Sequence, residues 1–260
     1  MLFTIFRNGY NLGPAGLYTL KIGEKVAQLL FEREDHDAVN LPGTSWNPRT
    51  DLITFASDHL DDMTEIWTIN PNDRSARRVT RHQPSDNRAF LESSFSPDGQ
   101  WNVFESQTID VENSVDGDIW KTRLDGTDLT KLVSGRLDDR QPNWSPTDDR
   151  ILFQRREPGS DNWDIYTMRS DGTDVRAVTR EPSSDTDASW SPDGKRIVYS
   201  SDSGGLKKPG IFVIDSGGGV PTRVTRNNEA SDAAPSWSPD RTWIYFESHP
   251  EEDAPASLWR

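Results

Sequence analysis

Cysteine is absent from the 260-residue chain, which excludes disulfides and thiolate metal sites. The redox compartment stays open, because exported proteins can lack cysteine too. Long apolar runs are also missing: no window of about 18 apolar residues occurs, so no membrane insertion is predicted. Residues 1–10 show neither the apolar core nor the cleavage site of a signal peptide.

Basic residues are scarce and scattered. Lys and Arg number 29 against 43 Asp and Glu, for a net charge of −14. No basic stripe is formed, which argues against nucleic acid and against an anionic membrane surface as partners. Aliphatic content is low as well, with hydrophobic residues at 32%. Ten tryptophans compensate, so we expect a core built largely from aromatic area.

What the chain has in abundance is a pattern that occurs five times at a period of 46 to 49 residues. Each copy holds an aromatic residue, a turn like Ser-Pro-Asp-Gly, a second aromatic nine residues after the first, and a third 12 to 16 residues later. The first-position aromatics are Phe95 and Trp46, Trp144, Trp190 and Trp237. Such a period with strand and turn signals indicates radial repetition of one structural unit.

The copy over residues 184–225 shows how one unit is built. Pro, Asp and Gly at 192–194 suit a tight turn, and glycines at 217–219 suit a hairpin. Strands, named A to D from the axis outward, are predicted at 188–190, 196–200, 210–214 and 222–225. Four antiparallel strands per unit are typical of a propeller blade. The predicted fold class is therefore all-β, a β-propeller, and no helix is expected.

The phase of the repeat places partial blades at both ends of the chain. Phe6 and Tyr18 fit the second and third aromatics of another copy, whose strand A would precede residue 1. The last copy ends without a strand D. We therefore predict one domain over 1–260 with six blades, the first and last incomplete. The alternative is five blades with a composite closing blade. The predicted blades span about 1–40, 41–90, 91–139, 140–185, 186–232 and 233–260.

Two motifs identify the repeat. Residues 190–202, Trp-Ser-Pro-Asp-Gly-Lys-Arg-Ile-Val-Tyr-Ser-Ser-Asp, and Asp164–Met168 followed by Asp171 and Gly172 closely resemble the PD40, or WD40-like, repeat of the TolB propeller family. The resemblance implies a six-bladed propeller. The best-known relatives are periplasmic components of the Tol-Pal cell-envelope system that bind other proteins, so it implies a periplasmic, protein-binding role. The same repeat occurs in propellers attached to serine peptidases and in oligogalacturonate lyases. The chain shows no counterpart of the α/β domain that precedes the propeller in TolB.

Acidic residues crowd the longer loops. Antiparallel order places the D–A and B–C loops on one side, here the loop face, and the short A–B and C–D hairpins on the other. The predicted binding residues on the loop face are Asp35, Asp37, Asp86, Asp139, Asp187 and Asp232. Further acids are Glu34, Asp61, Asp62, Asp110, Glu112, Asp138, Asp185, Glu251, Glu252 and Asp253. Carboxylates around a channel mouth focus negative potential, which favours a basic peptide, a basic protein surface or a divalent cation. The alternative is that acidic loops serve solubility alone.

Three other residues of the loop face are candidates. Trp163 breaks the aromatic pattern within a B–C loop, where it would anchor a partner. His36 and His82 occupy neighbouring D–A loops and, with an Asp or Gln83, would form a site for Mn or Zn. That site would suit an oligogalacturonate-lyase-like enzyme, and solvent-exposed loop histidines are the alternative.

Enzyme motifs are missing from the sequence: it contains no G-x-S-x-G, H-E-x-x-H or P-loop pattern. No catalytic residue is therefore predicted. The sequence favours a non-enzymatic, monomeric protein-binding propeller without a resident cofactor. The gating propeller of a larger hydrolase is a further alternative.

Overall fold

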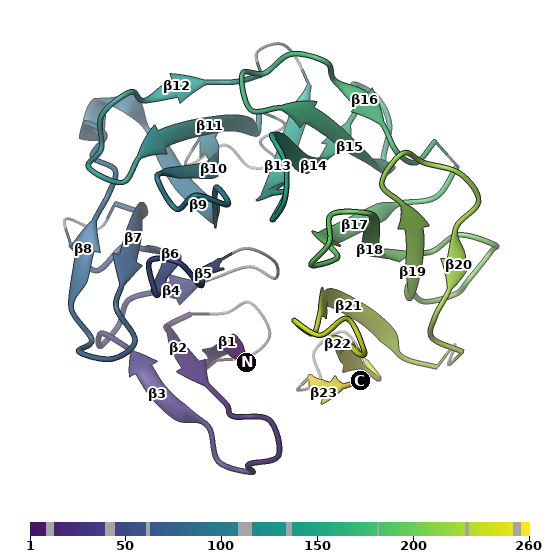
Figure 1. The fold of residues 1–260 in the computed structure, drawn as a ribbon, viewed down its shortest axis with the longest axis horizontal. Helices are drawn as coiled ribbons and strands as arrows, with labels where there is room; N and C mark the ends of the chain where they lie inside the picture. Colours follow the sequence, from purple (N-terminus) through teal and green to yellow (C-terminus); the bar gives the residue numbers. More distant parts are fainter. Residues whose placement is uncertain are drawn as a thin grey trace.

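The computed structural model describes residues 1–8, 13–39, 45–60, 63–108, 116–133, 137–180, 182–226, 229–251 and 256–260. Within these ranges the protein is built from strands, with one short 3-10 helix, η1 (Pro84–Asp86). None of the described helices is long and apolar enough to cross a membrane. Six antiparallel sheets follow one another around a central axis (Figure 1). The six-bladed, all-β prediction is confirmed.

Each sheet is one blade, and the blades follow chain order. Blade 1 holds β1 (Leu2–Phe6), β2 (Ala15–Thr19) and β3 (Gln28–Phe31). Blade 2 holds β4 (Ala38–Val39), β5 (Trp46–Asn47), β6 (Leu52–Ser57), β7 (Glu65–Ile69) and β8 (Ala76–Arg78). Blade 3 holds β9 (Arg88–Phe95), β10 (Trp101–Thr108), β11 (Asp118–Arg123) and β12 (Thr130–Lys131).

The second half of the ring repeats this plan. Blade 4 holds β13 (Asp138–Trp144), β14 (Arg150–Arg156), β15 (Trp163–Arg169) and β16 (Arg176–Ala177). Blade 5 holds β17 (Asp185–Trp190), β18 (Arg196–Ser201), β19 (Gly210–Asp215) and β20 (Thr222–Arg223). Blade 6 holds β21 (Ser231–Trp237), β22 (Ile244–His249) and β23 (Ser257–Trp259).

Blades 1 and 6 are three-stranded neighbours in the ring (Figure 1). Their strands form two separate sheets, β1-β2-β3 and β21-β22-β23, and no pairing between these described strands joins them. The alternative of five blades with a composite closing blade is therefore wrong. In blades 3 to 5 each strand pairs with the strand that precedes or follows it, so A lies innermost and D outermost, as Figure 1 shows for β9 to β12. In blade 2 the inner strand is divided into β4 and β5, which both pair with β6.

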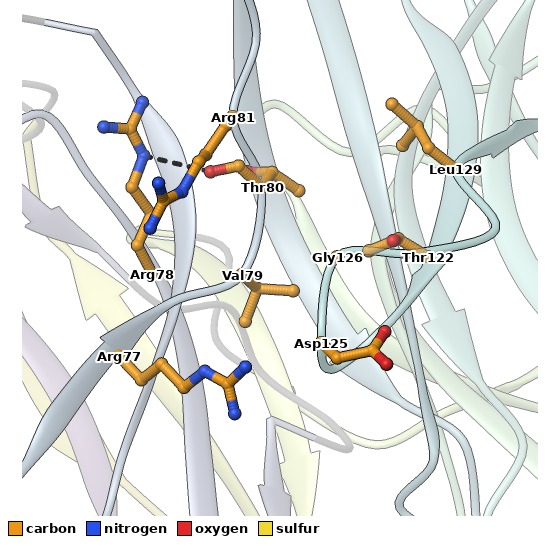
Figure 2. A pocket seen from close by; sticks show the side chains of 9 residues that line it. All are labelled: Arg77, Arg78, Val79, Thr80, Arg81, Thr122, Asp125, Gly126 and Leu129. Carbon is orange, nitrogen blue, oxygen red and sulfur yellow. Dashed lines mark hydrogen bonds between the residues drawn. The ribbon is translucent and has the colours of Figure 1, made fainter.

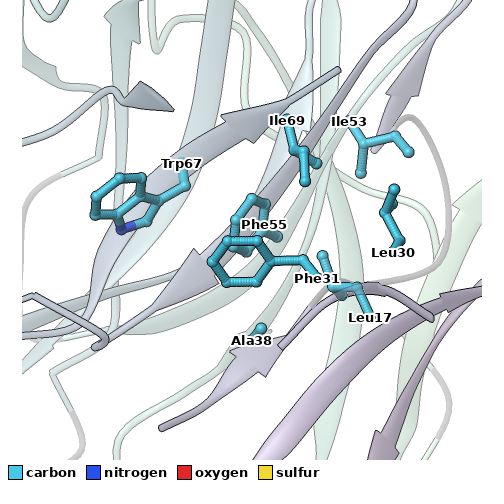
Figure 3. Close-up of a cluster of buried hydrophobic side chains, with 8 residues drawn as sticks. All are labelled: Leu17, Leu30, Phe31, Ala38, Ile53, Phe55, Trp67 and Ile69. Atoms are coloured by element: carbon cyan, nitrogen blue, oxygen red, sulfur yellow. The ribbon is translucent and has the colours of Figure 1, made fainter. Parts of the chain in front are cut away.

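The hydrophobic core lies between neighbouring blades. In Figure 3, Leu17, Leu30 and Phe31 of blade 1 meet Phe55 and other side chains of blade 2. The rings of Phe31 and Phe55 are 4.9 Å apart. The next interfaces repeat the arrangement, and four of the five second-position aromatics have almost no exposed surface: Phe55 0%, Phe104 0%, Phe153 0% and Tyr199 1%. Phe246 of the last blade is half-buried. A blade therefore completes its core only against its neighbours.

The A–B turn of blade 5 shows why its residues recur. Asp193 Oδ1 accepts hydrogen bonds from Ser191 Oγ (2.7 Å) and from the amide of Lys195 (3.2 Å). Gly194 has a φ of 69°. A Cβ at Gly194 would lie 2.2 Å from Thr147 Oγ1 in the A–B turn of blade 4. This glycine therefore meets two requirements, a left-handed backbone and a close approach between blades.

Replacing Gly194 with alanine should destabilise the protein more than the same change at Gly204. Both glycines have a left-handed φ, and a Cβ at Gly204 would meet no atom within 4 Å. Gly204→Ala should cost about 1 kcal/mol from backbone strain alone, whereas Gly194→Ala should cost about 2–4 kcal/mol because overpacking adds to the strain. Urea denaturation measures both, and equal losses would contradict the inter-blade contact.

Candidate binding face and channel wall

A β-bulge interrupts four inner strands at the same position, three residues before the first-position aromatic. The residues there, with their φ angles, are Glu92 (54°), Gln141 (52°), Asp187 (54°) and Ala234 (48°). A left-handed conformation costs a non-glycine residue roughly 1–2 kcal/mol. Bulges re-aim side chains and backbone groups. The strands β9, β13, β17 and β21 are the innermost of their blades in Figure 1, so the strained position recurs around the central axis, a region here called the channel wall.

Three of the four bulge amides are bound by side chains from the preceding blade. Glu105 Oε2 accepts from the Gln141 amide at 2.9 Å. Gln141 Oε1 accepts from the Asp187 amide at 3.1 Å, and Asp187 Oδ2 accepts from the Ala234 amide at 3.5 Å. Gln141 Nε2 also donates to Asp187 Oδ1 at 3.1 Å. These four residues, the channel-wall network, connect blades 3 to 6 side by side.

Two glutamates lie at the start of this network. Glu105 is fully buried, and Gln107 Nε2 donates a hydrogen bond to its Oε1. Arg140 Nε lies 4.0 Å from the same oxygen. Burial, and then the charge of Glu105, raise the pKa of Glu92 well above its usual value. Ionisation of Glu92 is therefore disfavoured, because its negative charge would lie in a buried site beside that of Glu105.

Asp187 is the predicted binding residue that joins the channel-wall network. Burial raises the pKa of its carboxyl group, while the hydrogen bond from Gln141 opposes that shift. The negative charge of Glu247, on the neighbouring blade, raises the pKa further. A cation that approached Asp187 would relieve this repulsion.

Asp139 and Asp232 are buried inside their own blades. Asp139 forms a bidentate ion pair with Arg155, with N–O distances of 2.6 and 2.8 Å. Burial raises the pKa of Asp139 although Arg155 lowers it. Asp232 Oδ1 accepts from Ser248 Oγ at 2.7 Å. These two carboxylates are occupied by partners one strand away.

The loop between blades 1 and 2 gathers Asp35, His36 and Asp37. Asp35 is exposed, with a φ of 61°. The Asp37 amide donates to Asp58 Oδ1 at 2.8 Å, and His36 Nδ1 lies 3.4 Å from the same oxygen. Burial, followed by the charge of Asp58, raises the pKa of the half-buried Asp37. The carboxyl groups of Asp37 and Asp58 thus lie close together, and that of Asp37 is poorly solvated.

His82 and Asp86 lie at the junction of blades 2 and 3. The His82 side chain is buried, with Nδ1 3.1 Å from Glu65 Oε1 and its ring 4.9 Å from that of Phe90. Asp86 is exposed and its Oδ2 accepts from the Gln83 amide at 2.9 Å. His36 and His82 therefore contact different carboxylates. Within the ranges given above, no group of three or more His, Asp or Glu side chains is arranged to hold a metal ion.

Trp163 begins β15 on the loop face and is held between two guanidinium groups. The Arg156 group lies 4.8 Å and the Arg140 group 5.4 Å from the ring centre. Both arginines donate to the buried Asp138, each with a bond of 2.7 Å. The half-buried ring is therefore fixed in position, as an anchor for a partner should be.

The sequence reasoning identified Asp187 but missed Glu92, Glu105 and Gln141. The sequence contains a clue to two of them: Glu92 and Gln141 lie three residues before the first-position aromatic, as Asp187 does. Other predicted acids of the loop face lie outside the described residues: Asp61, Asp62, Asp110, Glu112, Glu252 and Asp253.

Comparison with known proteins supports the repeat assignment. The family model PD40, the TolB beta propeller domain, matches residues 141–230, which confirms the resemblance seen in the sequence. The uncharacterized protein Atu1656 of Agrobacterium fabrum is 27% identical over 160 residues, covering 58% of this chain and 51% of that protein. The chain thus spans about half the length of this curated relative.

Solved structures with the same fold come from more than one functional class. TolB from Acinetobacter baumannii superposes with a TM-score of 0.73 at 17% identity, covering 99% of this chain and 59% of TolB. A puromycin hydrolase superposes with a TM-score of 0.65 at 17% identity, covering 99% of this chain and 43% of the hydrolase. At these identities the likeness shows the fold alone.

Replacing Glu92 with glutamine should stabilise the protein at alkaline pH. The raised pKa means that folded Glu92 keeps its proton where the unfolded chain has lost it. Its contribution is therefore fully present below the unfolded pKa, near 4.3, and is lost as pH rises toward the folded pKa. Glutamine keeps a hydrogen-bond donor without the ionisation, so urea denaturation should show a larger gain at pH 8 than at pH 4.

The matched control is Glu251→Gln, which removes a glutamate carboxyl group at an exposed position. It should leave the pH dependence of unfolding unchanged. A gain for Glu92→Gln that is equal at both pH values would count against the raised pKa of Glu92.

Proposed function

We propose that the chain is a protein-binding propeller that presents its loop face and channel mouth to a basic peptide segment or a basic protein surface. The observation that carries the proposal is the strained channel wall, where Glu92 and Asp187 occupy equivalent bulges and the charges of Glu105 and Asp187 both raise the pKa of Glu92. Strained residues that recur at one place are typical of functional sites. In this case they hold acidic groups where a cation would relieve their repulsion.

Binding on this face would rely on rigid display. The blades fix the loops, the acidic residues attract a basic segment, and Trp163 supplies an apolar surface held by Arg140 and Arg156. Electrostatic complementarity of this kind mainly raises the association rate. No resident cofactor is part of the proposal. The likeness to TolB favours a periplasmic, Tol-Pal-like setting for the partner.

A second candidate function is that of a propeller within a larger hydrolase. The likeness to the puromycin hydrolase favours it, because the whole chain matches less than half of that enzyme. The two candidates are separated by reading the gene around this chain: an in-frame hydrolase domain favours the second, and its absence favours the first.

Salt should slow the association of a basic probe peptide with the protein. A flexible 12-residue peptide with four lysines is the probe, and a peptide with glutamates in their place is the control. The association rate, followed by biolayer interferometry, should fall by roughly tenfold between about 50 and 500 mM salt, because ions screen the attraction. Asp187→Asn should raise the Kd by about fivefold, or about 1 kcal/mol.

Asp215→Asn is the matched control, since Asp215 is an exposed aspartate at the C–D hairpin end of the same blade. It should leave the affinity unchanged. A rate indifferent to salt, or equal effects of the two variants, would remove the channel mouth from the binding site.

Removing the Trp163 ring should weaken the same complex. Trp163→Ala deletes an immobilised aromatic surface on the loop face, so the Kd should rise by about tenfold. Trp243→Ala is the control, because Trp243 also stacks on an arginine, Arg260 at 4.5 Å, but follows an A–B turn on the opposite face. If both variants bind the lysine peptide as well as the unaltered protein does, Trp163 is not an anchor.

A further inference from the structure

A crevice between blades 2 and 3 holds two adjoining pockets of about 270 and 380 Å³. Both have Arg81 and Leu129 in their walls. Figure 2 shows the first pocket, with Arg77, Arg78 and Arg81 along one side and Leu129 on the other. The second pocket adds Phe90 and Trp120. Together the pockets reach the size of small-molecule sites, and neither belongs to the channel wall.

Two guanidinium groups of this crevice lack carboxylate partners. Arg77 and Arg81 are exposed and form no ion pair with any residue that the structure describes. Arg78 and Arg88, by contrast, are bound to Glu65 at 2.6 Å and to Asp118 at 3.2 Å. On a chain with a net charge of −14, two such cations in one crevice form a local site for an anion.

The acidic residues in the pocket walls are occupied by their own turns. Asp125 Oδ1 accepts from the amide of Thr127 (3.0 Å) and from its hydroxyl group (2.6 Å). The Asp86 carboxylate is bound to the Gln83 amide. Neither aspartate forms an ion pair with Arg77 or Arg81 in the part of the chain that the structure covers.

The second pocket also contains a donor without an acceptor. Trp120 Nε1 is buried and has no hydrogen-bond partner within the described ranges. In blade 2 the equivalent Trp67 Nε1 donates to the Ser57 carbonyl at 3.3 Å. In blade 3 the equivalent carbonyl, that of Ser106, accepts from Arg88 Nη2 at 2.8 Å. The Trp120 indole is therefore not bound to Ser106 as Trp67 is to Ser57, although Trp120 borders the second pocket.

Among the described residues, blade 3 has no counterpart of one stacking ring of blade 2. Between blades 1 and 2, His59 packs on Trp67 with ring centres 4.1 Å apart. The equivalent residue of blade 3 is Thr108, whose hydroxyl donates to Asp116. Within the part of the chain that the structure describes, Trp120 therefore lacks the stacking that His59 gives to Trp67, and it forms part of a pocket wall with Phe90 and Leu129.

We propose that this crevice binds a small organic carboxylate that carries an apolar body. The apolar body fits against Phe90, Trp120 and Leu129. The carboxylate pairs with Arg81, which borders both pockets, in the planar geometry that guanidinium groups favour. A free acid and the C-terminal residue of a peptide share this chemistry.

Titration of the ¹⁵N-labelled protein with phenylacetate tests the proposal. The indole N–H signal of Trp120, assigned by its loss in Trp120→Phe, should shift saturably with a Kd on the order of 1–10 mM. The neutral phenylacetamide should leave this signal unshifted.

Arg81→Gln should raise the Kd for phenylacetate by about tenfold, because it removes the partner of the carboxylate. Arg180→Gln should have no effect, since Arg180 holds the same repeat position in blade 4.

The second arm of the experiment uses acetyl-Gly-Phe and its C-terminal amide. Tighter binding of the dipeptide acid than of phenylacetate assigns the crevice to peptide termini, and the reverse assigns it to free acids. Three results would overturn the proposal: an unmoved Trp120 signal with both acids, equal shifts with the neutral amides, or equal losses in Arg81→Gln and Arg180→Gln. None of these titrations depends on binding at the channel mouth.

Discussion

The contact of one blade with the next is the interaction on which the rest of this structure depends. The second-position rings, Phe55, Phe104, Phe153 and Tyr199, are enclosed between neighbouring blades. Since no blade completes a core alone, the channel wall and the crevice are each properties of neighbouring blades. Three of the four bulge amides are bound by the preceding blade, and the crevice at Trp120 lies where blade 3 has Thr108 in place of the stacking His59 of blade 2.

The fold could be read from the sequence because its determinants are local. Turn residues such as Asp193 and Gly194 act within a few residues of themselves, and the same chemistry recurs at a fixed period. The number of blades follows from that period. Individual aromatics are less predictable: Trp46 stays 39% exposed and donates to Asp51, whereas Trp144 and Trp190 are buried.

The candidate site was harder to predict, because its determinants lie across strands and blades. Asp139 and Asp232 resemble Asp187 in sequence, yet Arg155 and Ser248 on the adjacent strands occupy their carboxylates. Glu92 and Gln141 owe their positions to β-bulges, and no residue type in the sequence is specific for such a bulge. Arg81 and Trp120 likewise come from neighbouring blades, so the pocket that both line cannot be recognised within one repeat of the sequence.

The channel-wall network also limits how far the inner strands can move apart. Its bonds run from Glu105 to Gln141, from Gln141 to Asp187 and from Asp187 to Ala234, always toward the next blade. Any radial expansion of the ring separates neighbouring blades, and directional hydrogen bonds lose more by such separation than broad apolar contacts do. Each bond therefore opposes separation of an inner strand from that of the next blade in chain order. An entering group that displaces Gln141 frees the bulge amide of Asp187 in the following blade.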